Sequence, residues 1–264
     1  MVDGFTKLIY RKEDGVASIV LNNPAKYNAL ELDLRKELKT ALEDAAKDAS
    51  VKVVVLRGAG GNFSAGADIR AFLEWTPSDA VRIGNDLGTS MVLSTIIRHM
   101  QKPVVAVVEG YCLGGGFELV QACDLVIASE DAVFGQPEIN IGLIPGGGGS
   151  QRLTRLVGEK KAKELIMTGE RVSASEMARL GVVNFVVSKD KLEEAVKNLL
   201  DKLLSKPPMA LAAAKEAINT ALETSLSTGL RVELQLFASL FATEDQKEGA
   251  RAFLEKRKPV WKGK

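Results

Sequence analysis

The sequence predicts an α/β fold in which a parallel sheet is followed by a helical C-terminal part. Short β-branched runs alternate with longer segments of helical periodicity, and this order favours parallel strands joined by right-handed crossovers. After Gly149 the strand-like runs become rare and helical patterns dominate. We therefore predict an α/β core over residues 1–190 and a helical region over residues 191–264.

The N-terminal half supplies the expected strands and the helices between them. Four short apolar runs, all containing valine and three of them rich in it, are predicted as strands: residues 16–21, 51–56, 103–108 and 125–128. A helix is expected over residues 30–46, where Leu34, Leu38 and Leu42 share one face. A second helix is expected over residues 77–99, because a proline suits its first turn.

Two capping patterns and a double proline organise the C-terminal part. Ser173 with Glu176, and Thr243 with Gln246, have the three-residue spacing of a capping box. Residues 206–208 (Lys-Pro-Pro) are expected to form the joint between two helices. We find no internal repeat and no low-complexity segment.

The composition excludes several functional classes. Among 264 residues the net charge is only +1, so no overall field attracts nucleic acid or an anionic membrane. No stretch approaches the ~18 apolar residues of a membrane span. The first fifteen residues lack an apolar segment and resemble neither a secretory signal nor a transit peptide. Cys112 and Cys123 form no metal or redox motif and are expected to be small buried residues in a cytoplasmic protein.

Three glycine-rich stretches, residues 62–69, 110–119 and 134–149, carry the candidate chemistry. The first two follow predicted buried strands, which places them where open α/β sheets bind ligands. A helix starting at residues 114–116 would offer free N–H groups to a ligand as an oxyanion site, and Ala67 could supply a second N–H. The alternative is that these glycines only allow close helix packing.

Other site chemistries fit the sequence poorly. Residues 110–116 match neither the dinucleotide fingerprint nor the phosphate-binding loop, and there is no serine elbow. The only histidine, His99, lies near a predicted helix end and is expected to be a structural or surface residue. These features disfavour triad hydrolysis and a histidine-rich metal site, and we predict no metal.

Carboxylates remain as the candidate acid–base groups. Glu118 lies three residues after Gly115, about one helical turn deeper, and Glu138 follows a proline in an otherwise apolar stretch. Taken singly, each glutamate is as consistent with a structural role as with a functional one. Asp124 has the simpler interpretation of a residue in a helix-to-strand turn.

The three stretches together resemble the enoyl-CoA hydratase, or crotonase, superfamily. The similarity extends to residues 22–30, 151–153 and 252–258 and so runs through most of the chain. It implies a crotonase-like ββα spiral core with a helical C-terminal trimerisation region. Family hydratases pair a glutamate three residues after the middle glycine with a second glutamate twenty residues later, and Glu118 and Glu138 have that spacing.

The resemblance also assigns roles to other residues. It implies that Ala67 and Gly115 supply the oxyanion-hole amides and that the Gly146 amide holds the catalytic water. The expected contacts with coenzyme A, the last two of them made by a neighbouring subunit, are Lys26, Ala65, Asp68, Ile69, Arg70, Phe253 and Lys256. Candidates for the acyl pocket are Phe72, Leu73, Trp75 and Phe117.

Retention of both glutamates implies an enoyl-CoA hydratase, a hydro-lyase (EC 4.2.1.-) of fatty acid metabolism. It would add water syn to a short 2-trans-enoyl-CoA, such as crotonyl-CoA, and give a 3-hydroxyacyl-CoA. Coenzyme A is then part of the substrate, and no separate cofactor is expected. Three alternatives stay open: a 3-hydroxypropionyl-CoA dehydratase, an enoyl-CoA isomerase, and a non-catalytic RNA-associated relative.

Assembly is expected from the same resemblance. Family members are typically trimers or dimers of trimers, which implies a homotrimer or homohexamer here. The predicted C-terminal helices carry more apolar residues than a lone peripheral helix needs, at Leu234, Leu236, Phe237, Leu240 and Phe241. Packing within one chain is an equally consistent explanation of this pattern.

Overall fold

The computed structural model describes residues 4–264, apart from the side chains of Thr89 and Ser90. Its main sheet has six strands in the order β1-β2-β3-β4-β6-β9. The strands are β1 (Leu8–Glu13), β2 (Val16–Leu21), β3 (Val53–Gly58), β4 (Val104–Val108), β6 (Leu125–Ser129) and β9 (Phe185–Val187). β1 is antiparallel to β2, and every other neighbouring pair is parallel. The parallel pairing predicted for the four strands is confirmed.

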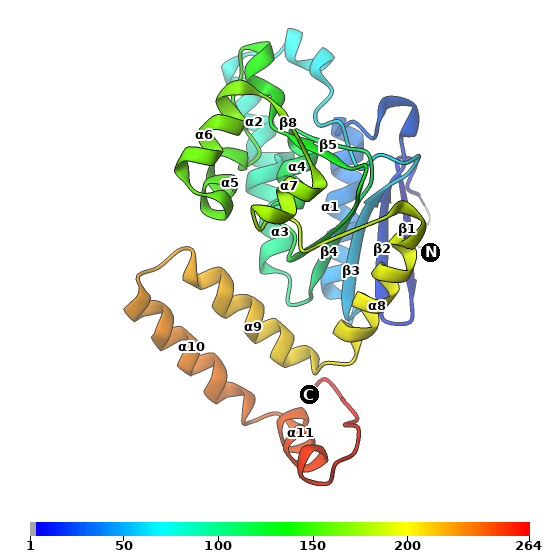
Figure 1. Cartoon of the computed structure of the whole chain (residues 1–264), viewed down its shortest axis with the longest axis vertical. Coiled ribbons are helices and arrows are strands. Elements are labelled where there is room, and N and C mark those ends of the chain that lie inside the picture. The colour runs from blue at the N-terminus through cyan, green and yellow to red at the C-terminus, as the bar shows by residue number, and fades with distance from the viewer. Residues whose placement is uncertain (1–3) are drawn as a thin grey trace.

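Successive residues of the central strands face two different hydrophobic layers. In β3, Val54 and Leu56 join the core cluster that contains the buried leucines of α1 (Leu32–Lys47). Val53 and Val55 instead face α8 (Leu192–Leu204). The sheet is thus covered by helices on both faces, as Figure 1 shows. Each fully buried valine or leucine contributes about 1.5–3 kcal/mol to this packing.

A small second sheet follows the end of β4 and carries the candidate site. It consists of β5 (Tyr111–Leu113), β7 (Val133–Gly135) and β8 (Arg171–Ser173). The short helix α4 (Gly115–Val120) follows β5, and the 3-10 helix Pro137–Ile141 follows β7. Since β5 and β7 are parallel neighbours, these two helices begin at the same edge. The sequence pattern did not predict these three-residue strands, because they are too short to show a period.

The helix predicted over residues 77–99 is interrupted. Helix α2 (Pro77–Leu87) is followed by a π-helical turn (Thr89–Leu93) and then by α3 (Ser94–His99). Gly88 between them is extended, with ψ 146°. A Cβ atom on Gly88 would lie 2.1 Å from the Gly84 carbonyl oxygen, so the break requires glycine. Because apolar residues recur at helical spacing on both sides of Gly88, the sequence pattern does not reveal this break. His99 is exposed at the helix end, as expected.

The C-terminal half is mostly helical, as predicted. Its helices are α5 (Gly149–Val157), α6 (Glu159–Thr168), α7 (Ala174–Arg179), α8, α9 (Pro208–Ala221), α10 (Leu226–Leu240) and α11 (Glu244–Leu254), with a 3-10 turn at Lys189–Lys191. The Lys-Pro-Pro joint between α8 and α9 is confirmed. Ser173 and Thr243 cap α7 and α11 by accepting from the backbone N–H of Glu176 and Gln246. The reciprocal half of the first box is not formed, because Glu176 pairs with Arg179 instead.

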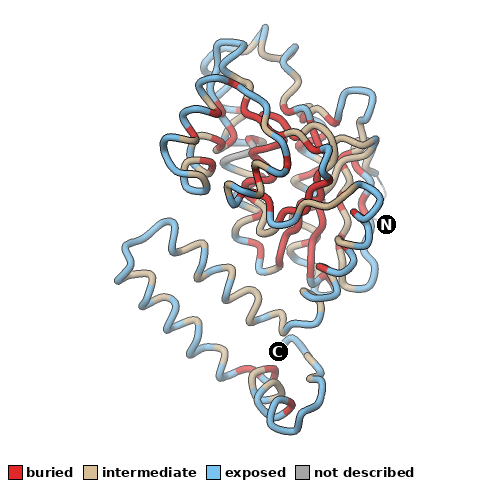
Figure 2. Tube along the Cα trace, in the orientation of Figure 1, coloured by how far each residue is buried: buried red, intermediate tan, exposed pale blue. Residues whose placement is uncertain are grey.

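Helices α9 to α11, called the C-terminal arm below, extend away from the sheet (Figure 1) and are largely exposed (Figure 2). A buried ion pair attaches the arm to the core. Lys215 of α9 lies 2.7 Å from the Asp124 carboxylate and also donates to the carbonyl oxygens of Ile97 and Lys102. Asp124 accepts the Val104 N–H as well, so it has the structural role expected of it. Within residues 4–264, no helix has the length and apolar character needed to cross a membrane.

Candidate active site

Glu118 is a carboxylate buried at the start of α4. Only 3% of its surface is exposed. The chain enters the helix through Gly114, whose φ of +50° is open to glycine but strained for other residues. Gly116 is needed for a different reason, since a Cβ atom there would lie 2.7 Å from Ser64 Cβ. The glycine triplet therefore serves both close packing and the placement of Glu118.

Two backbone amides of the third glycine stretch bind this carboxylate. Gly147 and Gly149 donate to Glu118 Oε1 at 2.6 and 2.8 Å. Arg152 of α5 donates to the Gly147 carbonyl oxygen at 3.1 Å and so fixes the same peptide segment. Burial raises the pKa of Glu118, while the two N–H groups and the charges of Arg152 and Arg35 oppose that rise. The sequence indicated a glycine run here but did not single out these two amides.

Glu138 lies in the 3-10 helix at the end of β7, with Pro137 in its first turn. Mainly through burial, and secondarily through the negative charge of Glu118, its pKa is raised to about 7. The side chain reaches the turn before α4, since a Cβ atom on Gly114 would lie 3.1 Å from Glu138 Oε1. The two glutamates thus approach one site from neighbouring strands of the small sheet.

Two buried glutamines support Glu138. In the amide orientation that satisfies its neighbours, Gln136 donates to both carboxylate oxygens of Glu138, at 3.1 and 3.2 Å, and accepts from Gln121 Nε2 at 2.9 Å. Gln136 also lies against Gly149, where a Cβ atom would come within 2.4 Å of its side-chain amide group. The neutral Gln136 amide thus contacts Glu138 and also packs against the residue whose N–H binds Glu118. No pattern in the sequence pointed to either glutamine.

The predicted oxyanion amides lie on two loops that touch each other. A Cβ atom on Gly66 would lie 3.3 Å from the Gly115 nitrogen and 2.9 Å from the Leu113 carbonyl oxygen. Gly66 has φ +95°, which again favours glycine, and Ala67 follows it directly. Within residues 4–264, neither the Ala67 N–H nor the Gly115 N–H donates to a backbone carbonyl. Both amides are therefore available to an external acceptor.

Gly146 directly precedes Gly147, one of the two residues whose amides bind Glu118. It is exposed, whereas Gly147 is buried. The amides that bind Glu118 belong to Gly147 and Gly149, and the contact of Gly146 with a water molecule stays a prediction.

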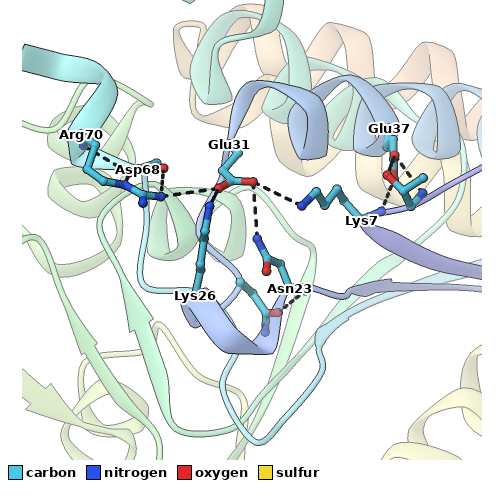
Figure 3. A network of polar contacts seen from close by, with 9 residues as sticks. Lys7, Asn23, Lys26, Glu31, Glu37, Asp68 and Arg70 are labelled. Atoms are coloured by element: carbon cyan, nitrogen blue, oxygen red, sulfur yellow. Dashed lines mark hydrogen bonds and ion pairs between the residues drawn. The ribbon is translucent and has the colours of Figure 1, made fainter. Parts of the chain in front are cut away.

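Three of the predicted coenzyme A contacts gather around Glu31 at the surface (Figure 3). Lys26 forms an ion pair with Glu31, and Arg70 lies 3.8 Å from the same carboxylate. Arg70 also binds Asp68 at 2.6 Å, and Lys7 completes the network at 3.6 Å from Glu31. The sequence did not indicate Lys7 or Glu31. The network brings three cations together around two carboxylates.

Ala65 and Ile69 flank this network on the same loop. Ala65 is exposed, and its N–H donates to the Tyr27 carbonyl oxygen at 2.9 Å, which joins the loop to the segment that carries Lys26. Ile69 begins the 3-10 helix Ile69–Leu73 with 56% of its surface exposed. An exposed isoleucine beside a cationic cluster suits a ligand that has both apolar and anionic parts.

The remaining predicted contacts do not meet the site within one chain. Phe253 and Lys256 lie at the end of α11, which Figure 1 shows at the far end of the molecule from α4. Phe253 is 83% exposed. Among the acyl-pocket candidates, Phe117 is fully buried against Phe134, with ring centroids 5.3 Å apart, and so belongs to the core.

Phe72 and Trp75 lie beside each other, with ring centroids 4.9 Å apart. Leu73 between them is 85% exposed. Phe72 and Trp75 are half-buried, so the three side chains form a partly exposed apolar cluster that follows Ile69 and Arg70 in the chain. Unlike Phe117, they stay available as candidates for contacts with an acyl chain.

Comparisons with known proteins agree with this geometry. A family model described as enoyl-CoA hydratase/isomerase matches residues 11–264. A short-chain-enoyl-CoA hydratase from Clostridium acetobutylicum is 41% identical, with 95% of each chain covered. A crotonyl-CoA hydratase from Syntrophomonas wolfei is also 41% identical, over 96% of this chain and 97% of its own.

The fold comparison gives the same result. The crystal structure of an enoyl-CoA hydratase subunit from Geobacillus kaustophilus matches with a TM-score of 0.92 and 43% identity, covering 98% of this chain and 99% of that one. The expected crotonase-like fold is thereby confirmed. The chain belongs to the enoyl-CoA hydratase/isomerase family.

Proposed function

We propose that this protein is a short-chain enoyl-CoA hydratase that uses Glu118 and Glu138 as an acid–base pair. One observation carries the proposal: Glu118 is held by two backbone amides, and beside it Glu138 has its pKa raised to about 7. Two adjacent carboxyl groups in different environments can exist near neutral pH as one base and one acid. Addition of water to a double bond needs one of each.

The thioester carbonyl is bound by the Ala67 and Gly115 amides. Their N–H groups stabilise the negative charge that develops on the carbonyl oxygen when water adds to the conjugated double bond. One such donor is typically worth about 2.7–4 kcal/mol of transition-state stabilisation. The two loops that carry these amides are in direct contact, so the distance between the donors is fixed before substrate binds.

Glu118 is the base and Glu138 is the acid. Because the Gly147 and Gly149 N–H groups and two arginine charges favour its ionised form, Glu118 deprotonates the water that adds at Cβ. Glu138, whose pKa is raised to about 7, supplies the proton to Cα. Both carboxyl groups approach the same face of the substrate, which gives syn addition. The reverse sequence dehydrates a 3-hydroxyacyl thioester, and no step requires a metal or a separate cofactor.

The substrate class rests on the relatives and on the surface network. Two relatives that align over nearly the whole chain are named for short-chain enoyl-CoA and for crotonyl-CoA. Lys7, Lys26 and Arg70 offer positive charge for the phosphates of coenzyme A at the surface near the site. We therefore propose that the substrate is an enoyl-CoA whose acyl chain has about four carbons, as in crotonyl-CoA. We also propose that the enzyme is cytoplasmic, in agreement with its two unpaired cysteines.

Replacing Glu138 by Gln tests the proposal. The variant keeps the shape of the side chain and removes the proton donor, so crotonyl-CoA hydration should fall about 10²–10⁴-fold in kcat with little change in KM. Glu130→Gln, which neutralises an exposed glutamate of the preceding loop, should leave both constants unchanged. Unchanged turnover in Glu138→Gln would contradict the assignment.

The same preparation distinguishes the competing reactions. An isomerase would convert 3-enoyl-CoA faster than it hydrates crotonyl-CoA. A dedicated dehydratase would prefer 3-hydroxypropionyl-CoA to the C4 and longer substrates. We expect hydration of crotonyl-CoA to be faster than isomerisation of a 3-enoyl-CoA and faster than dehydration of 3-hydroxypropionyl-CoA.

We further propose that the protein assembles as a homotrimer or as a dimer of trimers. The C-terminal arm leaves large apolar side chains exposed that one chain does not cover, among them Phe237 at 59% and Phe253 at 83%. In an assembly, Phe253 and Lys256 could reach the coenzyme A of a neighbouring subunit. Sedimentation should give a native mass of about three or six times the 28.3 kDa chain.

A further inference from the structure

Ser64 is a fully buried serine in the loop that carries the Ala67 amide. Its side chain belongs to a residue with no exposed surface. Burying a hydroxyl group is unfavourable unless the group is hydrogen-bonded. Alanine would occupy nearly the same space with no polar group to satisfy, so the partners of this hydroxyl indicate its task.

The Ser64 hydroxyl joins two segments of the chain. It donates to the Asn28 carbonyl oxygen at 2.8 Å and accepts the Gly66 N–H at 3.1 Å. Because its single proton is directed at Asn28, a lone pair of its oxygen is left for the Gly66 amide. The hydroxyl therefore holds the loop just before Ala67 against the segment that follows Lys26.

Asn28 is a fixed anchor for this hydroxyl. It is fully buried and has a left-handed backbone, with φ +53°. Its side-chain nitrogen donates to the carbonyl oxygens of Ala59 and Asn62, at 2.9 and 2.8 Å, and its side-chain oxygen accepts the Asn23 N–H at 2.9 Å. These three bonds fix the Asn28 carbonyl oxygen that Ser64 uses as its acceptor.

The peptide group between Gly66 and Ala67 carries the proposed oxyanion donor. Its carbonyl oxygen, which belongs to Gly66, accepts the Leu30 N–H at 2.8 Å. The C=O and N–H of a trans peptide group point in opposite directions. Binding of this carbonyl by Leu30 therefore directs the Ala67 N–H away from Leu30, and the Ser64 hydroxyl holds the preceding peptide group in place.

Ser64 also contacts the second loop of the proposed oxyanion site. Its N–H donates to the Tyr111 carbonyl oxygen, and its own carbonyl oxygen accepts the Leu113 N–H, both at 2.9 Å. A Cβ atom on Gly116 would lie 2.7 Å from Ser64 Cβ. Since β5 leads directly into Gly115, one residue contacts both loops that supply the two amides.

We propose that Ser64 is a positioning residue for the hydration reaction, whose buried hydroxyl holds the loop so that the Ala67 and Gly115 amides bind the thioester carbonyl oxygen together. The proposal rests on the proposed function, in which these two amides form the oxyanion site. Ser64 acts through the loop and not on the substrate, because its hydroxyl is buried and bonded to the protein on both sides.

The kinetics of Ser64→Ala test this proposal. The variant removes the hydroxyl and keeps the Cβ atom that packs against Gly116. The Gly66 N–H loses its acceptor, but the bond from Leu30 to the Gly66 carbonyl remains, so the Ala67 amide should be misplaced and not lost. We expect kcat for crotonyl-CoA to fall about 5–30-fold, less than the roughly 10²–10³-fold cost of removing an oxyanion donor, with KM changed by less than about 2-fold.

The carbonyl stretch of bound butyryl-CoA measures the oxyanion site directly. This saturated thioester has no double bond to hydrate and stays intact in the site. Hydrogen bonds from the two amides weaken its C=O bond and lower the stretching frequency, which infrared difference spectra of isotope-labelled ligand record. The lowering should be smaller in Ser64→Ala than in the wild type, and a loss of stability alone would not change it.

Two further variants separate the hydrogen bond from packing. Ser64→Cys has a slightly larger side chain but a weaker hydrogen-bonding group, so its kcat should lie between those of the wild type and Ser64→Ala. It is assayed with a reductant, because Cys112 is the β-bridge partner of Ser64. Ser129→Ala removes another fully buried hydroxyl, which bonds to Asp131, and should keep the wild-type kcat and carbonyl frequency.

The possible outcomes separate this inference from the proposed function. If the wild type does not hydrate crotonyl-CoA, the proposed function fails. If the wild type hydrates it but Ser64→Ala keeps the wild-type kcat and carbonyl frequency, Ser64 is a packing residue and the inference is wrong. Where Ser64→Ala does not fold, wild-type values in Ser64→Cys overturn the inference in the same way. A lower kcat with a smaller frequency shift, absent from Ser129→Ala, supports it.

Discussion

The small sheet and the C-terminal arm complete their surfaces in opposite ways. Around α4, the chain supplies every partner of its buried carboxylate: Glu118 is bound by the amides of Gly147 and Gly149. Along α10, apolar side chains point outward with nothing from the same chain over them. In the first region one chain supplies all the hydrogen-bond donors that the buried carboxylate uses. In the second region the apolar side chains would be covered only by a second molecule. This contrast supports our proposal that chemistry and assembly belong to separate parts of one chain.

The large apolar side chains exposed along α10 and at its C-terminal cap form one continuous stripe. They follow each other at spacings of three or four residues, which places them on a single helix face: Leu226, Leu230, Leu234, Phe237 and Phe241. Phe237 and Phe241 already contact each other, with ring centroids 5.1 Å apart. A stripe of this length is typical of an interface and not of a free surface.

The largest effect is expected from a charge in this stripe. Leu234→Glu should convert the assembly into monomers, because a carboxylate in the centre of an apolar interface would be buried without a partner. Sedimentation velocity measures this change. In the monomer the glutamate site stays intact, so we expect KM for crotonyl-CoA to rise more than kcat falls.

A matched variant on the same helix controls for the added charge. Gln235→Glu introduces the same carboxylate at the next position, which is exposed and lies outside the stripe. It should leave the native mass unchanged. Dissociation in both variants, or in neither, would contradict the interface that we assign to the stripe.

A second prediction concerns the ion pair that joins the two regions. Lys215 of the arm is buried with Asp124 of the core, and removing one partner leaves the other charge uncompensated. Lys215→Met should therefore lower the free energy of unfolding by about 3–5 kcal/mol, as measured by urea denaturation. The substitution also removes the donor of two backbone carbonyl oxygens, those of Ile97 and Lys102, which adds to the loss of stability.

Two comparisons check the origin of this loss. Lys197→Met breaks an exposed ion pair with Asp201 on α8 and should cost about 0.5 kcal/mol or less. Combining Lys215→Met with Asp124→Asn removes both charges and should recover part of the stability. If the double variant is no more stable than Lys215→Met, the uncompensated charge is not the cause.

The two regions also differ in how far the sequence predicts them. Four of the five long strands (β2, β3, β4 and β6) and α1 follow from β-branched runs and leucine spacing, because their patterns extend over five or more residues. The fifth, β1 (LIYRKE), was not predicted, since its second half is charged and exposed. The two glutamates were indicated by their place after glycine and proline and by a family spacing. Their surroundings were not: Gly147 and Gly149 reach Glu118 through folding, from distant positions that no local pattern connects. Gln136 lies only two residues before Glu138, but nothing in the local sequence indicates that its side chain turns toward that carboxylate.

Arg35 shows a second limit of the sequence pattern. In the sequence it reads as one of the polar positions of an amphipathic helix, because charged residues are usually exposed. Only the packing of α1 against its neighbours reveals that it is buried. Conversely, the apolar spacing of α10 predicted a helix, but whether its leucines face the same chain or another could not be read from their order.

The smallest predicted effect tests how tightly the glutamate site is built. At Gly114, φ is +50° and a Cβ atom would lie 3.1 Å from Glu138 Oε1, so Gly114→Ala adds backbone strain and also crowds the proposed acid. Gly181 has a similar φ of +80° with nothing within 4 Å of its Cβ position, so Gly181→Ala adds strain alone. Each variant should lose about 1–2 kcal/mol of stability in thermal unfolding.

The value of kcat should distinguish the Gly114→Ala variant from the Gly181→Ala variant. Displacement of Glu138 by the new methyl group should lower kcat for crotonyl-CoA about 10–100-fold in Gly114→Ala, because a small misplacement of a reacting group is costly. Gly181→Ala should keep the wild-type kcat. If both variants keep it, the site tolerates movement of Glu138, and its fixed position cannot be what distinguishes the small sheet from the arm.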